Sequence, residues 1–180
     1  GQVARLVHVG AAPHGSVVLA ERTSPQLREI VKSILKPSDN ELAERLLLSL
    51  RWASGRRQLE PLELIGETWG ERGLYLRPLR LVDGSGLSRR NLLTPRFVVR
   101  LLTYMHDESA WAAALAHALP IAGVDGTLAH RMKDTCAEGR VRAKTGTLTG
   151  VSSLSGYAQA KGNETQAFSI MMNNFTCSVS

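Results

Sequence analysis

Apolar positions in the first two thirds of the chain recur with the three- and four-residue spacing of amphipathic helices. The first helix is predicted to begin at Ser24-Pro25, with Ser24 as its N-cap, and to end before Pro37. A second helix is predicted directly after it, because residues 38–41 match the S-x-x-E capping box with Ser38 as the cap. Further helices are predicted over residues 58–72, from Thr94-Pro95 onward, and over residues 111–119.

The last third of the chain is patterned as β-strands. Three are predicted, over residues 140–148, 151–160 and 166–174, and the loop at 161–164 is typical of a hairpin. A short strand is also predicted at 16–21, a turn at 83–86, and a loop at 123–128 that leads into a short helix. Helices followed by an antiparallel run of strands indicate an α+β fold.

Composition excludes several classes of function. The chain has 180 residues, which is one domain or a large part of one, with 43% hydrophobic and 21% charged residues. The net charge of +6 is spread along the chain without a basic cluster interleaved with aromatics, so no nucleic-acid partner is expected. Five histidines and two cysteines show no metal-ligand spacing, and neither a metal nor a cofactor is expected. Residues 1–15 are interpreted as a connection from an upstream segment.

The first of the three predicted strands contains Lys144-Thr145-Gly146. The lysine offers a positive charge, the threonine a hydroxyl donor, and the glycine a place where another backbone comes close. A phosphate-binding loop is disfavoured because Ala143 precedes the lysine where such loops need glycine. A solvated surface lysine remains the alternative. K-T-G is one of three elements, with S-x-x-K and S-D-N, of serine β-lactamases and penicillin-binding proteins.

The second element, S-D-N, occurs at Ser38-Asp39-Asn40, where a plain N-cap role for Ser38 is the competing explanation. If the two stretches meet in space, they form a site for an amide substrate. Asn40 offers a donor and an acceptor to a peptide, and Ser38 can relay a proton to a leaving amine. Lys144 can anchor a carboxylate, and the backbone N–H of Thr147 can form half of an oxyanion hole.

No serine in the chain is a convincing nucleophile. Ser33 and Lys36 match S-x-x-K, but Ser33 would lie near the end of a helix that Pro37 terminates. An activated serine is expected at a helix start, where free N–H groups are available. Ser85, between two glycines, fits a turn better than the G-x-S-x-G motif.

The chain resembles the class C low-molecular-weight penicillin-binding proteins, the D-alanyl-D-alanine carboxypeptidase/endopeptidases of the DacB type. Four stretches carry the resemblance in register, namely LKPSDN at 35–40, DGSGLSR at 83–89, VDGTL at 124–128 and VRAKTGTL at 141–148. The resemblance implies a β-lactamase/penicillin-binding transpeptidase-like fold, an antiparallel sheet flanked by helices with a helical subdomain. It also implies an exported enzyme of the periplasm or cell envelope, whose partners are peptidoglycan peptides ending in D-Ala-D-Ala and β-lactams.

Carried onto this chain, the resemblance implies catalytic roles for Ser38, Asn40 and Lys144. It implies substrate contacts for three further residues, Thr145, Gly146 and Thr147. A serine β-lactamase of the same fold and a non-catalytic peptidoglycan-binding fragment remain alternatives.

Departures from the family pattern are also expected to matter. The family places S-x-x-K well upstream of S-D-N, so residues 16–180 are interpreted as the C-terminal part of the peptidase domain. The N-terminal part of the same protein, with the nucleophile, is then a required partner, and an exposed apolar sheet edge is expected where its strands belong. The family topology puts Cys136 and Cys177 at opposite ends of the sheet, too far apart for a disulfide.

Overall fold

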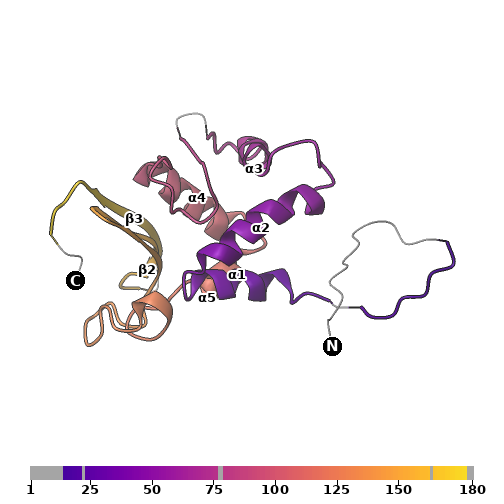
Figure 1. Cartoon of the computed structure of the whole chain (residues 1–180). Coiled ribbons are helices and arrows are strands. Elements are labelled where there is room, and N and C mark those ends of the chain that lie inside the picture. Colours follow the sequence, from indigo (N-terminus) through magenta and orange to yellow (C-terminus); the bar gives the residue numbers. More distant parts are fainter. Residues whose placement is uncertain (1–13, 22, 77–78, 163, 178–180) are drawn as a thin grey trace, which may run out of the picture.

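The structure is a computed structural model that describes residues 14–21, 23–76, 79–162 and 164–177. The elements of this part of the chain are five α-helices, one 3-10 helix and three β-strands (Figure 1). The α-helices are α1 (Leu27–Leu35), α2 (Asn40–Ala53), α3 (Pro61–Gly70), α4 (Pro95–Asp107) and α5 (Ala112–Ala118). They are followed by η1 (Gly126–Leu128), β1 (Val141–Leu148), β2 (Val151–Gln159) and β3 (Thr165–Asn173).

The three strands form an antiparallel meander in the order β1-β2-β3. The register pairs Lys144 with Ser155 and Tyr157 with Ala167. The helices lie to one side of this sheet (Figure 1). Helix α4 packs on β2 and β3, and α5 packs against both α4 and α1. This arrangement confirms the α+β fold and the three strands predicted from the sequence, each to within one residue at its ends.

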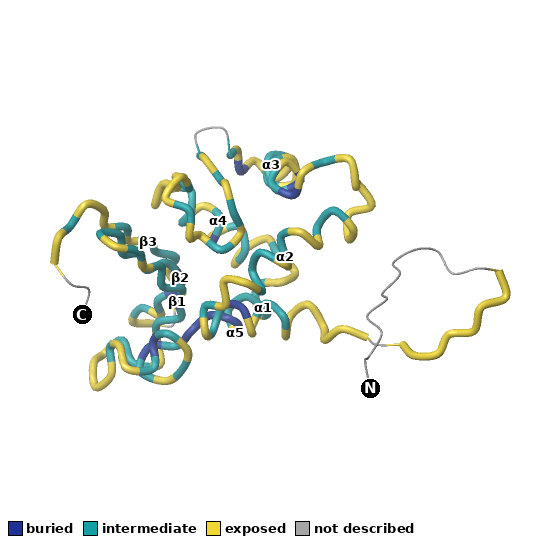
Figure 2. The backbone as a smooth tube through the Cα atoms, viewed as in Figure 1, coloured by how far each residue is buried: buried dark blue, intermediate teal, exposed yellow. Residues whose placement is uncertain are grey.

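A small core joins the sheet to the helices. Its buried members are Leu102 of α4, Leu119 after α5, and Tyr157 of β2. The Tyr157 hydroxyl donates a 2.8 Å hydrogen bond to the Leu102 carbonyl. Burial, with a contribution from the charge of Asp107, raises the pKa of Tyr157 to about 12, so the hydroxyl keeps its proton as a donor. Figure 2 shows buried residues in the segment that follows α5 and leads into η1.

Two predicted N-caps are wrong. Gln26, not Ser24, precedes the first turn of α1, because its backbone is still extended at φ −61° and ψ 146°. Asp39, not Ser38, caps α2, since the Asp39 carboxylate accepts a 2.8 Å hydrogen bond from the Leu42 amide. The α2 cap therefore lies one residue later than predicted, and Ser38 is left outside the helix.

The remaining differences are an absent strand, a shorter helix, and η1, which lies within the loop predicted at 123–128 and not after it. Residues 16–21 form no strand, and the segment is exposed along its length (Figure 2). The side chains of Val17, Val18 and Leu19 are 78–97% exposed. The helix predicted at 58–72 is shorter, because Pro61 takes its first position and Gly73 adopts a positive φ after its end. Of the predicted connection at 1–15, residues 1–13 lie outside the described residues.

Strand β3 forms an edge of the sheet in the described part of the chain. Its alternate residues Ile170 and Met172 are each 55% exposed, whereas Ala167 on the opposite face packs against the core. Strand β3 therefore combines an edge position with exposed apolar side chains on one of its faces. No described helix is long and apolar enough to cross a membrane.

Candidate active site

A groove of about 560 Å³ lies between the start of α2, the loop at 84–87, and β1. It is lined by the residues that the sequence singled out, namely Ser38, Asn40, Lys144, Thr145, Gly146 and Thr147. The stretches S-D-N and K-T-G therefore meet in space, as expected. Asn40 takes the first position of α2 because Asp39 caps that helix.

Ser38 has a backbone conformation that is uncommon for serine, with φ of 64° in the left-handed region. Its hydroxyl accepts a 2.7 Å hydrogen bond from the Lys144 ammonium, which also donates to the Thr145 carbonyl at 2.7 Å. Burial lowers the pKa of Lys144 below its ordinary value of 10.5. The contact therefore places the Ser38 hydroxyl, which can transfer a proton, next to the partly desolvated ammonium of Lys144.

The outer edge of β1 faces the groove. The Ala143 amide donates to the Pro120 carbonyl on the side away from β2. In an antiparallel pair the N–H groups alternate in direction with a period of two, so those of Thr145 and Thr147 point to the same outer side. The N–H of Thr147, expected to form half of an oxyanion hole, thus lies on the outer edge of β1, and the N–H of Thr145 points to the same side.

Gly146 is explained by a neighbour that the sequence analysis missed. A methyl group added at Gly146 would lie 2.5 Å from the hydroxyl oxygen of Ser153, its cross-strand partner on β2. Ser153 also lines the groove. The glycine therefore makes room for the Ser153 hydroxyl beside β1.

The far wall of the groove is the loop that follows Asp83. Glu44, one helical turn after Asn40 on α2, accepts hydrogen bonds from the amides of Gly84 and Ser85 at 3.0 and 2.9 Å. Asp83 accepts from the Gly86 and Ser88 amides and from the Asn91 side chain. Glu44 was missed by the sequence analysis, although its spacing of four residues from Asn40 places it on the same helix face.

Lys36, the lysine of the rejected S-x-x-K match, forms an ion pair and a hydrogen bond outside the groove. Its ammonium contacts both carboxylate oxygens of Asp125, at 2.7 and 2.6 Å, and donates to the Leu119 carbonyl at 2.7 Å. Desolvation raises the pKa of Asp125, but hydrogen bonds from Lys36 and the Ile121 amide, with the charges of Lys36 and Arg142, outweigh it and lower the pKa. This ion pair ties the turn before Ser38 to the loop before η1.

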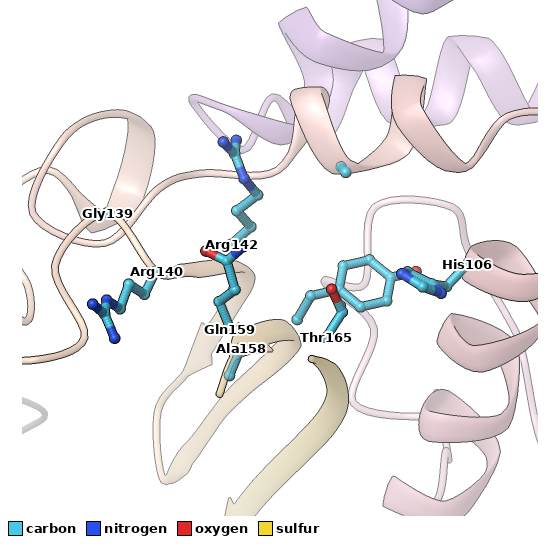
Figure 3. Close-up of a pocket in the computed structure, with 9 residues that line it drawn as sticks. His106, Gly139, Arg140, Arg142, Ala158, Gln159 and Thr165 are labelled. Carbon is cyan, nitrogen blue, oxygen red and sulfur yellow. The ribbon is translucent and has the colours of Figure 1, made fainter. Parts of the chain in front are cut away.

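A second, smaller cavity of about 220 Å³ lies at the opposite end of the sheet, next to His106, Arg140, Arg142 and Thr165 (Figure 3). The guanidinium groups of Arg140 and Arg142 point in different directions, so they do not converge on one anion (Figure 3). Among the described residues, no group of three or more His, Cys, Asp or Glu side chains is placed to hold a metal ion. Cys136 and Cys177 are exposed free thiols.

Known proteins share this sequence and fold. A D-alanyl-D-alanine carboxypeptidase of Actinomadura sp. (strain R39) is 44% identical over 163 residues, which are 87% of this chain and 30% of the relative. The crystal structure of penicillin-binding protein 4 (dacB) from Haemophilus influenzae matches with a TM-score of 0.76 and 29% identity, over 84% of this chain and 34% of that one. The same protein complexed with a novel β-lactam matches with a TM-score of 0.76 and 29% identity, over 84% of this chain and 35% of that one.

The chain thus spans about a third of the length of the proteins it resembles. The sequence profile of one family matches it from residue 1 to residue 180. These findings confirm the resemblance drawn from the four motif stretches. The chain belongs to the D-Ala-D-Ala carboxypeptidase 3 (S13) family.

Proposed function

We propose that this chain contributes the S-D-N and K-T-G walls of the active site of a serine-type D-Ala-D-Ala carboxypeptidase/endopeptidase. The enzyme would act on peptidoglycan stem peptides through an acyl-enzyme. The observation that carries the proposal is the 2.7 Å contact between Lys144 and Ser38, in a groove that Asn40 and the outer edge of β1 also line. Membership of the S13 family supports the reaction class.

In the proposed reaction, a serine hydroxyl attacks the carbonyl carbon that joins the last two D-Ala residues of the peptide. The C–N bond breaks, the terminal D-Ala leaves as an amine that takes up a proton, and the remaining peptide stays on the serine as an ester. Water then hydrolyses the ester. Ser38 delivers the proton to the leaving amine, and Asn40 hydrogen-bonds the backbone amide of the substrate.

The K-T-G strand binds the charged end and the oxyanion. Lys144 and Thr145 hold the terminal carboxylate of the substrate, through a positive charge and a hydroxyl donor. The outward N–H of Thr147 donates to the oxygen that becomes negative during attack. Gly146 keeps the strand close to the substrate backbone, and the edge of β1 pairs with an extended peptide.

The nucleophile is proposed to lie in another part of the protein. Ser33 and Lys36 do not serve, because the Lys36 ammonium is bound by Asp125 and Leu119. Ser85 lies in a turn that Glu44 holds in place. We therefore propose that residues 16–180 form one part of the peptidase domain, completed by the rest of the protein. The site would bind β-lactams as well as stem peptides, in the periplasm or cell envelope.

The test uses the complete natural protein. Fluorescent penicillin should label it covalently, and release of D-Ala from diacetyl-Lys-D-Ala-D-Ala should fall at least a hundredfold in Ser38→Ala. The exposed Ser49→Ala on α2 is the matched control and should keep the wild-type rate. Rapid turnover of penicillin without release of D-Ala would instead indicate a β-lactamase. Peptide binding with neither reaction would indicate a non-catalytic binding protein.

A further inference from the structure

The hydroxyl of Thr145 already has a hydrogen-bond partner, which is not one of the residues that line the groove. Thr145 Oγ1 donates a 3.0 Å hydrogen bond to Thr127 Oγ1, which comes from η1, 18 positions earlier in the chain. Thr145 lines the groove, whereas Thr127 does not. Thr127 therefore contacts the K-T-G strand through this hydrogen bond and is not one of the residues that line the groove.

Thr127 is held firmly by its own backbone. Its amide donates to the Lys36 carbonyl at 3.1 Å, and its neighbour Leu128 is fully buried. Gly126 packs so closely that an added methyl group would lie 2.7 Å from the same Lys36 carbonyl. Threonine is also restricted at χ1. The Thr127 oxygen therefore has a fixed place beside Thr145, and its hydrogen is the part that is free to turn.

A threonine hydroxyl has one hydrogen to donate and two lone pairs that accept. The geometry of the contact makes the Thr145 hydroxyl the donor and the Thr127 hydroxyl the acceptor. To bind a carboxylate, which accepts but cannot donate, Thr145 must turn that hydrogen toward the groove. Thr145 then loses its partner unless Thr127 turns its own hydrogen toward the Thr145 oxygen. Each change is a rotation of a hydroxyl hydrogen about its own Cβ–Oγ1 bond.

We propose that Thr127 is a positioning residue for the substrate carboxylate: its hydroxyl donates to Thr145 when Thr145 donates to the anion. This inference rests on the proposed function, in which Lys144 and Thr145 bind the terminal carboxylate. A ligand that ends in a primary amide can donate to Thr145 and leaves the original direction of the bond unchanged. Thr127 thereby increases the preference of the groove for a carboxylate over a neutral end.

The test compares two peptides, acetyl-D-Ala-D-Ala with a free carboxylate and the same peptide with a C-terminal amide. Their dissociation constants are measured by calorimetry with the complete protein and with Thr127→Val, which keeps the shape and the backbone contacts but removes the hydroxyl. We expect Thr127→Val to weaken binding of the carboxylate peptide about tenfold and binding of the amide peptide less than twofold. Thr127→Ser should restore the preference, and Thr103→Val, an exposed threonine on α4, is the control.

Two results would overturn the inference. One is equal weakening of both peptides in Thr127→Val, which would indicate a purely structural role. The other is unchanged binding of the carboxylate peptide. Failure of the proposed function would give a different result. The wild-type protein would prefer the carboxylate peptide and Thr127→Val would lose that preference, but penicillin would not acylate the wild-type protein. In that case the carboxylate site stands and the peptidase assignment does not.

Discussion

The side-chain nitrogen of Lys144 lies 2.7 Å from the hydroxyl oxygen of Ser38, although 106 positions separate the two residues. The contact joins the turn before α2 to β1. It depends on Ser38 lying outside the helix, with Asp39 in the N-cap position. The left-handed backbone of Ser38 is therefore part of what brings its hydroxyl to the lysine.

Two substitutions at Ser38 should distinguish the backbone strain at this position from the role of its hydroxyl in acylation. A left-handed conformation costs an L-residue roughly 1–2 kcal/mol, and glycine avoids that cost. We expect Ser38→Gly to be more stable than Ser38→Ala by about 1 kcal/mol, measured as a higher thermal midpoint. Both variants should be acylated by penicillin on the order of a hundredfold more slowly. Equal stability of the two variants would contradict the claim that the left-handed backbone of residue 38 is strained.

The titration of Lys144 should be visible in activity and in stability. Burial lowers its pKa in the folded protein, so the folded state loses this proton at a lower pH than the unfolded chain does. Between the two pKa values the unfolded chain binds more protons, and stability therefore rises with pH across that interval. As pH rises, Lys144 should lose its charge at a pH below 10.5, the ordinary pKa of lysine. The rate of acylation by a carboxylate-bearing penicillin should therefore decline over the same rise in pH.

The matched variant is Lys144→Arg, since arginine keeps its charge at every pH used. Its acylation rate should be lower than that of the wild type but should show no such decline with pH. A decline of the same shape in both proteins would assign the titration to another group.

Gly146 and Ser153 should be coupled energetically. Gly146→Ala places a methyl group 2.5 Å from the Ser153 hydroxyl and should lower stability by about 1–3 kcal/mol. Ser153→Ala removes that oxygen, so adding Gly146→Ala to it should be nearly neutral. Chemical unfolding of the two single variants and the double variant gives the interaction energy. Additive effects would contradict the contact.

The ion pair of Lys36 and Asp125 should make the protein sensitive to acid. The folded state lowers the pKa of Asp125, so the stabilisation is present above the unfolded value, near 3.8, and is lost as pH falls through the folded value. The Asp125 side chain is 38% exposed, so Asp125→Asn should lower stability at pH 7 by only about 1–2 kcal/mol. Its difference from wild type should shrink in acid; a constant difference from pH 7 to pH 2 would argue against the pair.

The 180-residue chain by itself should not react with penicillin, because the proposed nucleophile is not in it. Fluorescent penicillin added to the isolated chain should leave no covalent label on a denaturing gel, whereas the complete protein should be labelled. A labelled band from the isolated chain would place the nucleophile within these residues. The exposed Ile170 and Met172 on β3 also predict poor solubility of the isolated chain.

Local patterns in the sequence determined the elements of this protein. Helical spacing, Pro61 and Pro95 at helix starts, and the glycine loop between β2 and β3 located the helices and strands, because each signal acts within a few residues. The motifs S-D-N and K-T-G also identified residues of the groove, since their residue types are those that bind a carboxylate and an amide.

The tertiary structure decided which neighbours these residues have. Ser38 and Asp39 are both good N-cap residues, and in the folded chain Asp39 caps α2 while the Ser38 hydroxyl contacts Lys144. Three further contacts join residues that are far apart in the sequence, so no local pattern indicates them. They are the hydrogen bonds of Thr145 with Thr127, of Lys36 with Asp125, and of the Gly84 amide with Glu44. Hydrogen bonds and ion pairs act over about 3 Å, so the folded chain alone can show which distant side chains come within that reach.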